Sequence, residues 1–551
     1  MTRRRLQLLA GLGYFACATG LPFLGPLFGQ PAEEAAFLDD AAAAVGSAGA
    51  LLGLGSVEDG ASSGGHRNDD GGVEELFMDQ RLDHFDRQDS RTFSQRYFMN
   101  RRFWTGADSG APVFLCVGGE GPPLKPNVLY ESVHCNDMME LAPQHNALLV
   151  AVEHRYYGKS NPGANWATRK LRWLSSQQAL ADLSSFHGYL SDKEGLSGDE
   201  KWVTWGGSYP GMLAGWARLK YPHLFHAAVS SSSPMKAQLD FPEYTEVVRD
   251  SLASEEDGVG GSEECASAVE KGHSSIGGML QTPEGRLDLV TTFDLCKNNS
   301  LEDESARVMF AGDGVVMLPI QGNDPACNDT LCNIKAVCGI MTDDDKGSEV
   351  ERLAAIRKAQ RQSSSCEPFP PASSDRSAAG GLRRSLKVET PPALEMSPHG
   401  LGGSSVKDPS NPDRAWLYQT CSEFGFYQTC EVGTRCPFTQ GLHTLDLDLK
   451  ICEEAFGITP EQAREQVRLT NLFYGGDKPS GSRVIFPNGA IDPWHALGVL
   501  ESPESDLPVL LVPGASHHFW THPSKPTDTP DVVKARVEIW DQVTDWLEED
   551  D

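Results

Sequence analysis

The chain has 551 residues, of which 39% are hydrophobic, and it carries a formal net charge of −30 at pH 7. This length exceeds one compact core, so we expect two domains or one domain with a large insertion. The negative charge argues against a nucleic-acid partner, because a protein that binds phosphates needs the opposite sign.

The N-terminal segment predicts where the protein goes. Arg3 to Arg5 form a basic start, no charged residue follows until Glu33, and Ala16 to Ala18 offer a small-residue cleavage site. Residues 1–30 are therefore predicted to be a signal peptide for the secretory pathway. The alternative is a retained membrane anchor, because the stretch is long enough to span a bilayer. Residues 31–72, which are low in complexity, are expected to form a linker.

Residues 73–235 are predicted to form the first part of an α/β core. Apolar positions alternate from Phe77 to Phe98, and buried-strand runs then alternate with helical patterns. This order predicts a largely parallel sheet that is covered on both faces. The expected strands lie at residues 112–117, 147–152, 201–205 and from 227 onward, and the expected helices at 174–190 and 212–219.

Residues 236–460 interrupt this alternation of strands and helices and are predicted to be an inserted, mostly helical cap domain. Of 13 cysteines, Cys17 would leave with the signal, and ten of the other 12 lie between Cys265 and Cys452. Such a density predicts disulfides in an oxidising compartment. Zinc binding by residues 327, 332 and 338 is rejected, because no paired Cys-x-x-Cys or matching His set accompanies them.

Two further features lie in the insertion. Residues 363–413 are rich in Ser, Pro and Gly and are expected to be disordered or looped out, with a dibasic processing site at Arg383-Arg384 as a hypothesis. Two Asn-x-Ser/Thr sequons predict N-glycosylation at Asn298 and Asn328.

The core pattern returns in residues 461–551, which are predicted to complete the sheet. Strands are expected at residues 483–486 and 509–512, and an amphipathic helix near 531–548. A split α/β core with an inserted cap fits this order.

The candidate nucleophile is Ser208. The apolar run that begins at residue 203 breaks at Gly206-Gly207, and Ser208 stands directly before a helical pattern. This arrangement is typical of the strand–Ser–helix turn of an α/β-hydrolase. Pro210 occupies the place of the second glycine in Gly-x-Ser-x-Gly. A proline is tolerated in the first turn of a helix, because the N–H that it lacks would have no helical partner there. The alternative is an ordinary serine N-cap.

The acid and base are expected in the loops after the last two strands. Asp492 follows the strand at 483–486, and His517-His518 follow the strand at 509–512. The chain order Ser, Asp, His is that of α/β-hydrolases. In open α/β sheets the functional residues lie just beyond the C-terminal ends of the strands. A histidine would take the serine proton, and the carboxylate would hold the imidazole tautomer. The alternatives are a turn-capping Asp and histidines on a polar loop.

The oxyanion hole needs backbone N–H groups that face the developing charge. The N–H of Tyr209 is one predicted donor, and the second is expected from the glycine loop at residues 118–121, with Gly119 as the candidate. A phosphate cradle is rejected for this loop, because it lacks the Gly-Lys-Ser/Thr ending and Glu120 would repel phosphate.

These residues resemble the serine peptidase family of lysosomal Pro-X carboxypeptidase, dipeptidyl peptidase II and thymus-specific serine protease. The likeness covers about residues 76–551 without the 363–413 tract. The similarity to the thymus-specific branch looks greatest at residues 207–211, Trp216 and residues 220–223. The other landmarks are Gln80 with Leu82 to Phe85, Gly119 to Gly121, Glu153 to Gly158, Gly206 to Tyr209, Asn488-Gly489 with Asp492 to Trp494, and His517-His518.

The resemblance implies that His517 is the base, from an ungapped match of residues 514–518. The family usually has an Asp two residues after the second His, where this chain has Trp520. The resemblance also implies an α/β-hydrolase fold with a helical cap, activity beside proline, frequently acidic pH and dimers, and no metal or organic cofactor. A lysosomal, vacuolar or extracellular location follows, with no membrane partner unless residues 1–30 are retained.

The predicted activity is that of a serine exopeptidase on proline-containing peptides. Glu120 could capture a substrate amino terminus and Arg155 a carboxylate, so dipeptidyl peptidase and carboxypeptidase modes both stay open. The alternative roles are a brace for the glycine loop and a buried structural ion pair. A lipase or esterase on the same fold, or a catalytically inactive secreted binding protein, are the rival functions.

Overall fold

The computed structural model describes residues 72–163, 166–296, 301–328, 331–361, 366–367 and 413–549. The predicted signal peptide and almost the whole predicted linker lie outside these residues, as do Arg383-Arg384 and most of the 363–413 tract. Within the described part, no helix is both long and apolar enough to cross a membrane.

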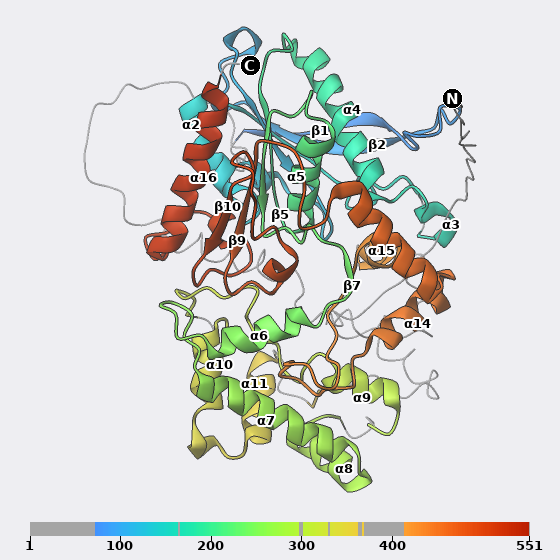
Figure 1. Cartoon of the computed structure of the whole chain (residues 1–551), viewed down its shortest axis with the longest axis vertical. Helices are drawn as coiled ribbons and strands as arrows, with labels where there is room; N and C mark the ends of the chain where they lie inside the picture. Colours follow the sequence, from blue (N-terminus) through green and yellow to red (C-terminus); the bar gives the residue numbers. More distant parts are fainter. Residues whose placement is uncertain are drawn as a thin grey trace, which may run out of the picture.

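The centre of the protein is an eight-stranded sheet with the order β1-β2-β4-β3-β5-β6-β9-β10 (Figure 1). Strand β2 runs antiparallel to both of its neighbours, and the pairs from β4 to β10 are parallel. The strands are β1 (Val73–Arg81), β2 (Thr92–Asn100), β3 (Val113–Val117), β4 (Leu148–Val152), β5 (Trp202–Gly207), β6 (Ala227–Ser231), β9 (Val484–Gly489) and β10 (Val509–Val512).

Helices cover both faces of this sheet. On β3, Val113 and Leu115 pack with residues of α4 and α5, whereas Phe114 packs with residues of α2 and α16. Because successive strand side chains point to opposite faces, a strand covered on both sides is apolar throughout. This explains the continuous apolar runs of the sequence. The core helices are α2 (Asn136–His145), α3 (Thr168–Leu171), α4 (Ser176–Glu194), α5 (Tyr209–Lys220) and α16 (Pro530–Glu548).

Between β6 and β9 the chain leaves the sheet, and we call this segment, residues 232–483, the cap. Helices α6 to α11 gather past the lower ends of β9 and β10, and α14 and α15 lie to one side of them (Figure 1). The cap elements are β7 (Gln238–Asp240), α6 (Glu243–Ala253), α7 (Glu263–Leu280), α8 (Pro283–Thr292), α9 (Glu304–Ala311), α10 (Ile334–Met341), α11 (Glu349–Gln360), α13 (Asp413–Gln419), the π-helix η6 (Thr420–Phe424), β8 (Gly425–Tyr427), α14 (Leu445–Phe456) and α15 (Pro460–Tyr474).

Helix α15 begins at the predicted boundary of residue 460, inside the segment that we call the cap, and it contacts both parts of the protein. Helix α15 packs against η6 and α14 of the cap. At its end, the ring of Tyr474 stacks on Trp216 of α5 with a centroid distance of 3.6 Å. Helix α15 therefore joins the cap to the core.

The predicted disulfides are confirmed, and five of the six lie in the cap. Cys327 bonds to Cys332 and Cys338 bonds to Cys265, so the residues of the rejected zinc site are all disulfide partners. The other pairs are Cys296–Cys366, Cys421–Cys452 and Cys430–Cys436 in the cap, and Cys116–Cys135 in the core.

Candidate active site

Ser208 lies at the turn between β5 and α5 and has an unusual backbone conformation. Its φ is 63° and its ψ is −134°, and its side chain makes no capping hydrogen bond to the helix. A non-glycine residue with positive φ stores strain that the surrounding structure must hold. The N–H of Ser208 donates to Ser231 O at 2.9 Å, and a Cβ at Gly206 would overlap the backbone of Pro210. Ser208 thus stands at the N-cap position of α5 without capping it, and its strained backbone has the conformation that a nucleophile elbow requires.

Pro210, which departs from the expected glycine, packs against the glycine loop that follows β3. A Cβ added to Gly119 would overlap the Pro210 ring. The absent side chain at Gly119 therefore provides the room that the proline ring occupies. The same contact brings the Gly119 backbone beside the first turn of α5, where Tyr209 is the first residue. The first N–H groups of a helix have no intrahelical partner, so the predicted oxyanion donor at Tyr209 is available on this ground.

Asp492 and His517 meet at the C-terminal ends of β9 and β10. His517 Nδ1 and Asp492 Oδ2 are 2.8 Å apart, and both side chains are buried. Asp492 Oδ1 accepts the Trp494 backbone N–H at 3.0 Å. His517 Nε2 is buried and has no hydrogen-bond partner among the described residues. The ring therefore has one nitrogen fixed by a carboxylate and the other free for a proton from a nucleophile.

His518 has a different environment, although the sequence alone left it beside His517 as a candidate base. Its Nδ1 lies 3.0 Å from Thr521 Oγ1, and its backbone N–H donates to Ser232 Oγ at 2.8 Å. Burial and the neighbouring histidines hold the pKa of His518 well below its ordinary value. A Cβ at Gly207 would lie 2.8 Å from the His518 ring. The His518 ring therefore packs the histidine loop against Gly207, the residue that precedes Ser208.

Trp520, at the position where the resemblance predicts Asp, is buried behind the same turn. Its Nε1 donates to Ser231 Oγ at 3.0 Å, and Ser231 O accepts the Ser208 N–H. The Arg536 Nε donates to the Trp520 carbonyl at 2.8 Å. The indole thus supports the end of β6 and, through it, the Ser208 turn.

Glu120 carries an unpaired oxygen. The residue is partly exposed, but its Oε2 is buried and has no hydrogen-bond partner among the described residues. Burial raises the pKa of Glu120 to about 7. A cation placed at this oxygen would favour the ionised carboxylate, because an opposite charge offsets the cost of burial.

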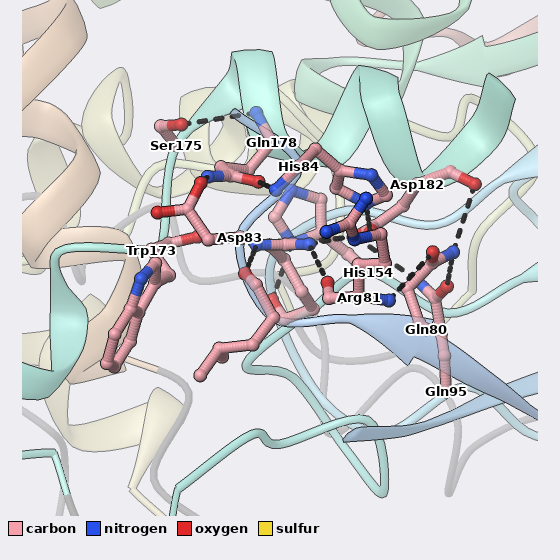
Figure 2. Close-up of polar contacts among 12 residues, drawn as sticks. Gln80, Arg81, Asp83, His84, Gln95, His154, Trp173, Ser175, Gln178 and Asp182 are labelled. Carbon is pink, nitrogen blue, oxygen red and sulfur yellow. Dashed lines mark hydrogen bonds and ion pairs between the residues drawn. The ribbon is translucent and has the colours of Figure 1, made fainter. Parts of the chain in front are cut away.

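Arg155, offered by the sequence as a carboxylate-capturing residue, is instead a buried structural ion pair. Its Nε and Nη2 donate to the two oxygens of Asp182, both at 2.6 Å. The remaining donors bind the carbonyls of Leu82, Trp173 and Arg81. All five guanidinium N–H groups are thus occupied, and none is left for a substrate. Figure 2 shows the surrounding cluster, in which Asp182 also contacts His84.

Aromatic side chains from the cap lie next to Asp492, and no local signal in the sequence indicates them. The Trp494 ring lies 5.3 Å from Tyr244, 5.5 Å from Phe426 and 5.8 Å from Phe241 between centroids. Gln321 also reaches this place: His517 N–H donates to Gln321 O at 3.0 Å. These cap residues were missed because only the folded insertion brings them to the strand ends.

Two further features of the structure concern the predicted glycosylation sites and metal binding. Asn328 is exposed, whereas Asn298 lies outside the described residues. In the part of the chain that the structure describes, no group of three or more His, Cys, Asp or Glu side chains is arranged to hold a metal ion.

The largely parallel sheet, the strained Ser208 turn and the Asp492–His517 contact together define an α/β-hydrolase fold with a cap. The sequence profile of the serine carboxypeptidase S28 family matches residues 80–539, so the chain belongs to that family and is a serine-type peptidase.

Known relatives extend over most of the chain. Thymus-specific serine protease is 36% identical over 482 residues in Mus musculus, with 86% of this chain and 87% of the relative covered. In Homo sapiens it is 36% identical over 491 residues, with 86% of each covered. Lysosomal Pro-X carboxypeptidase of Mus musculus is 24% identical over 482 residues, with 86% and 89% covered. The predicted family is confirmed.

Proposed function

We propose that this peptidase is an exopeptidase that cleaves peptides beside proline through Ser208, Asp492 and His517. One observation carries the proposal. His517 is bound to Asp492 through Nδ1, its Nε2 has no partner among the described residues, and its loop lies against the strained turn of Ser208. A serine hydroxyl is a weak nucleophile unless such a base takes its proton.

The reaction is acyl transfer in two halves. Ser208 Oγ attacks the scissile carbonyl while its proton moves to His517 Nε2, and Asp492 stabilises the imidazolium. The N–H groups of Tyr209 and of the Gly119 loop would bind the negatively charged oxygen. His517 then protonates the leaving amine as the peptide C–N bond breaks. Water, deprotonated by the same histidine, finally releases the acyl group from Ser208.

The aromatic residues beside Asp492 support a preference for proline. Next to the proposed acid, the partly exposed ring of Trp494 packs on the buried rings of Phe241, Tyr244 and Phe426. A proline side chain is a compact apolar ring, and aromatic faces supply large contact areas for such groups. A relative with 24% identity is named a Pro-X carboxypeptidase, which agrees with this preference.

The charged groups near the site favour recognition of the substrate amino terminus. Glu120 has a buried, unpaired oxygen in the loop that adjoins α5, and a substrate ammonium would give it a partner. Arg155 has no free N–H for a substrate carboxylate. We therefore propose the dipeptidyl peptidase mode, in which the acyl-enzyme carries an N-terminal dipeptide.

The proposed setting is the secretory route, ending in a lysosome-like compartment or outside the cell. Six disulfides require an oxidising environment for their formation. The exposed Asn328 is a proposed glycosylation site in that route. Peptides are the substrates of the family, and the homodimer stays a prediction for size measurement in solution.

The test incubates purified protein with peptides that carry proline near each end, at about pH 5 and about pH 7, beside Ser208→Ala. We expect release of an N-terminal X-Pro dipeptide, seen by mass spectrometry, and its loss when the peptide is N-acetylated. Removal of one C-terminal residue after proline would replace the proposed mode with the carboxypeptidase mode. Products equal to those of Ser208→Ala would favour the inactive binding protein, and cleavage of short acyl esters alone would favour the esterase.

A further inference from the structure

Gln321 is a cap residue that contacts both loops of the proposed acid and base. Its carbonyl oxygen accepts the His517 N–H at 3.0 Å. Its side-chain Oε1 accepts the indole N–H of Trp494 at 3.2 Å and lies 3.1 Å from the Tyr244 hydroxyl. Trp494 in turn donates its backbone N–H to Asp492. One residue of the cap is thus connected to the base directly and to the acid through one neighbour.

The chemistry of these neighbours fixes which way the Gln321 amide points. An indole N–H can only donate, so the amide atom that faces Trp494 must be the oxygen. Nε2 therefore points away from Trp494. Both side-chain hydrogen bonds of Gln321 among the described residues use Oε1, so Nε2 makes none there, and the side chain is partly exposed. The amide therefore has two N–H groups with a set orientation, in a residue whose backbone carbonyl contacts His517 and whose Oε1 contacts Trp494.

The backbone around Gln321 is held by further contacts, which makes this donor rigid. Ser516 Oγ donates to Asn323 O at 3.0 Å, so the histidine loop is attached to the same cap segment a second time. The Asn323 side chain accepts the Ile334 N–H at the start of α10. Asn333 donates to the carbonyls of Asp324 and Cys327. A donor fixed in this way loses little conformational entropy when a ligand binds.

We propose that Gln321 is a substrate-binding residue whose Nε2 donates a hydrogen bond to a backbone carbonyl oxygen of the bound peptide. The inference rests on the proposed function, because it takes the peptide to be bound at Ser208 and His517. A peptide backbone offers carbonyl acceptors at every residue, and a donor next to the base would align the chain for attack. Gln321 would thereby make substrate binding depend on the cap.

Two variants separate the donor from the acceptor role of the amide. Gln321→Glu keeps an oxygen for Trp494 and Tyr244 but removes the donor, whereas Gln321→Met removes both. At about pH 7 we expect KM of Gln321→Glu to rise about tenfold, the size of one lost hydrogen bond, with a smaller change in kcat and an unchanged melting temperature. Gln281→Glu, an exposed cap residue with the same change of charge, is the matched control and should behave as wild type.

The pH dependence gives a readout that a purely structural role would not move. In Gln321→Glu the new carboxyl group can donate again once it is protonated, so the KM defect should shrink as the pH falls toward about 4.3. Comparing peptides with a free C-terminal carboxylate and with a C-terminal amide identifies the acceptor. An equal defect for both supports an internal carbonyl, and a defect confined to the free acid overturns that assignment.

The two proposals fail in different ways. If Gln321→Glu has the KM of wild type while Ser208→Ala is inactive, the role of Gln321 is wrong and the proposed function stands. If wild type itself turns over no peptide beyond the level of Ser208→Ala, the proposed function fails first.

Discussion

The core and the cap are held together in different ways. Strands β3, β4 and β5 are buried along their whole length, and the core contains one disulfide. The cap contains five, together with ion pairs such as Arg249 with Glu263 and Glu270. In the doubly covered sheet, packing and hydrogen bonds such as that from the Ser208 N–H to Ser231 O hold the strained turn of Ser208. The helical insertion adds five covalent links to its own packing and to the hydrogen bonds that hold segments such as that of Gln321.

The first prediction tests how much a buried ion pair adds to apolar packing in holding the core, and it has the largest expected effect. Arg155→Met leaves Asp182 buried without its bidentate partner. We expect a loss of about 3–5 kcal/mol in the free energy of unfolding, because an uncompensated buried charge is costly. Denaturant unfolding measures it.

The double variant Arg155→Met with Asp182→Leu is the control for this loss. It buries no unpaired carboxylate, so we expect it to recover part of the stability. A single variant as stable as wild type would mean that the buried ion pair contributes nothing.

The second prediction concerns the covalent links of the cap. Cys265–Cys338 closes a sequence separation of 73 residues, whereas Cys327–Cys332 closes one of 5. In the chain-entropy account, replacing both cysteines by serine should cost about 4 kcal/mol for the long link and about 2 kcal/mol for the short one. Thermal unfolding of the two double variants checks the order. Equal losses would show that loop length does not govern how the disulfides stabilise the cap.

The third prediction uses the contact between the two regions and has the smallest expected effect. Glu423 of η6 accepts hydrogen bonds from the N–H and Oγ of Ser176 at the start of α4, and burial raises its pKa to about 7. The folded protein holds the Glu423 proton more tightly than the unfolded chain does. The resulting stability is fully present below the unfolded-state pKa of 4.5 and is lost as the pH rises through the folded-state pKa of about 7. The loss for this group should reach about 3 kcal/mol at most.

The measurement compares melting temperatures of wild type and Glu423→Gln from about pH 4.5 to about pH 7.5. The variant stays neutral, so it should gain on wild type as the pH rises. Glu453→Gln, an exposed cap residue, is the matched control and should follow wild type throughout. Parallel curves for wild type and Glu423→Gln would contradict the assignment.

Much of the core could be predicted from the sequence because doubly buried strands are apolar runs. The expected strand at 509–512 matches β10, and the expected strand at 112–117 matches β3 to within one residue. Helix α2 was not predicted. It is short, begins with polar residues and contains Pro143, and it depends on packing against the sheet and on the Cys116–Cys135 link.

The residues of the candidate site also fall into two groups, those that the local sequence indicates and those that it does not. Ser208, Asp492 and His517 each follow a predicted strand, so local pattern and chain order indicate them. Gln321 and Tyr244 carry no such pattern and reach the site only through the folded cap. That Arg155 is fully paired could not be predicted, because its partner, Asp182, lies 27 residues further along the chain and the local sequence does not reveal that the two meet.

The most direct test of the account is covalent labelling with a fluorophosphonate, followed by mass mapping of the modified peptide. The proposed triad predicts a single modified residue, Ser208, in wild type. It also predicts labelling slowed by orders of magnitude in Asp492→Asn, because that variant holds the wrong imidazole tautomer. No labelling of folded wild type, or labelling at another serine, would contradict the central claim that Ser208, Asp492 and His517 act together.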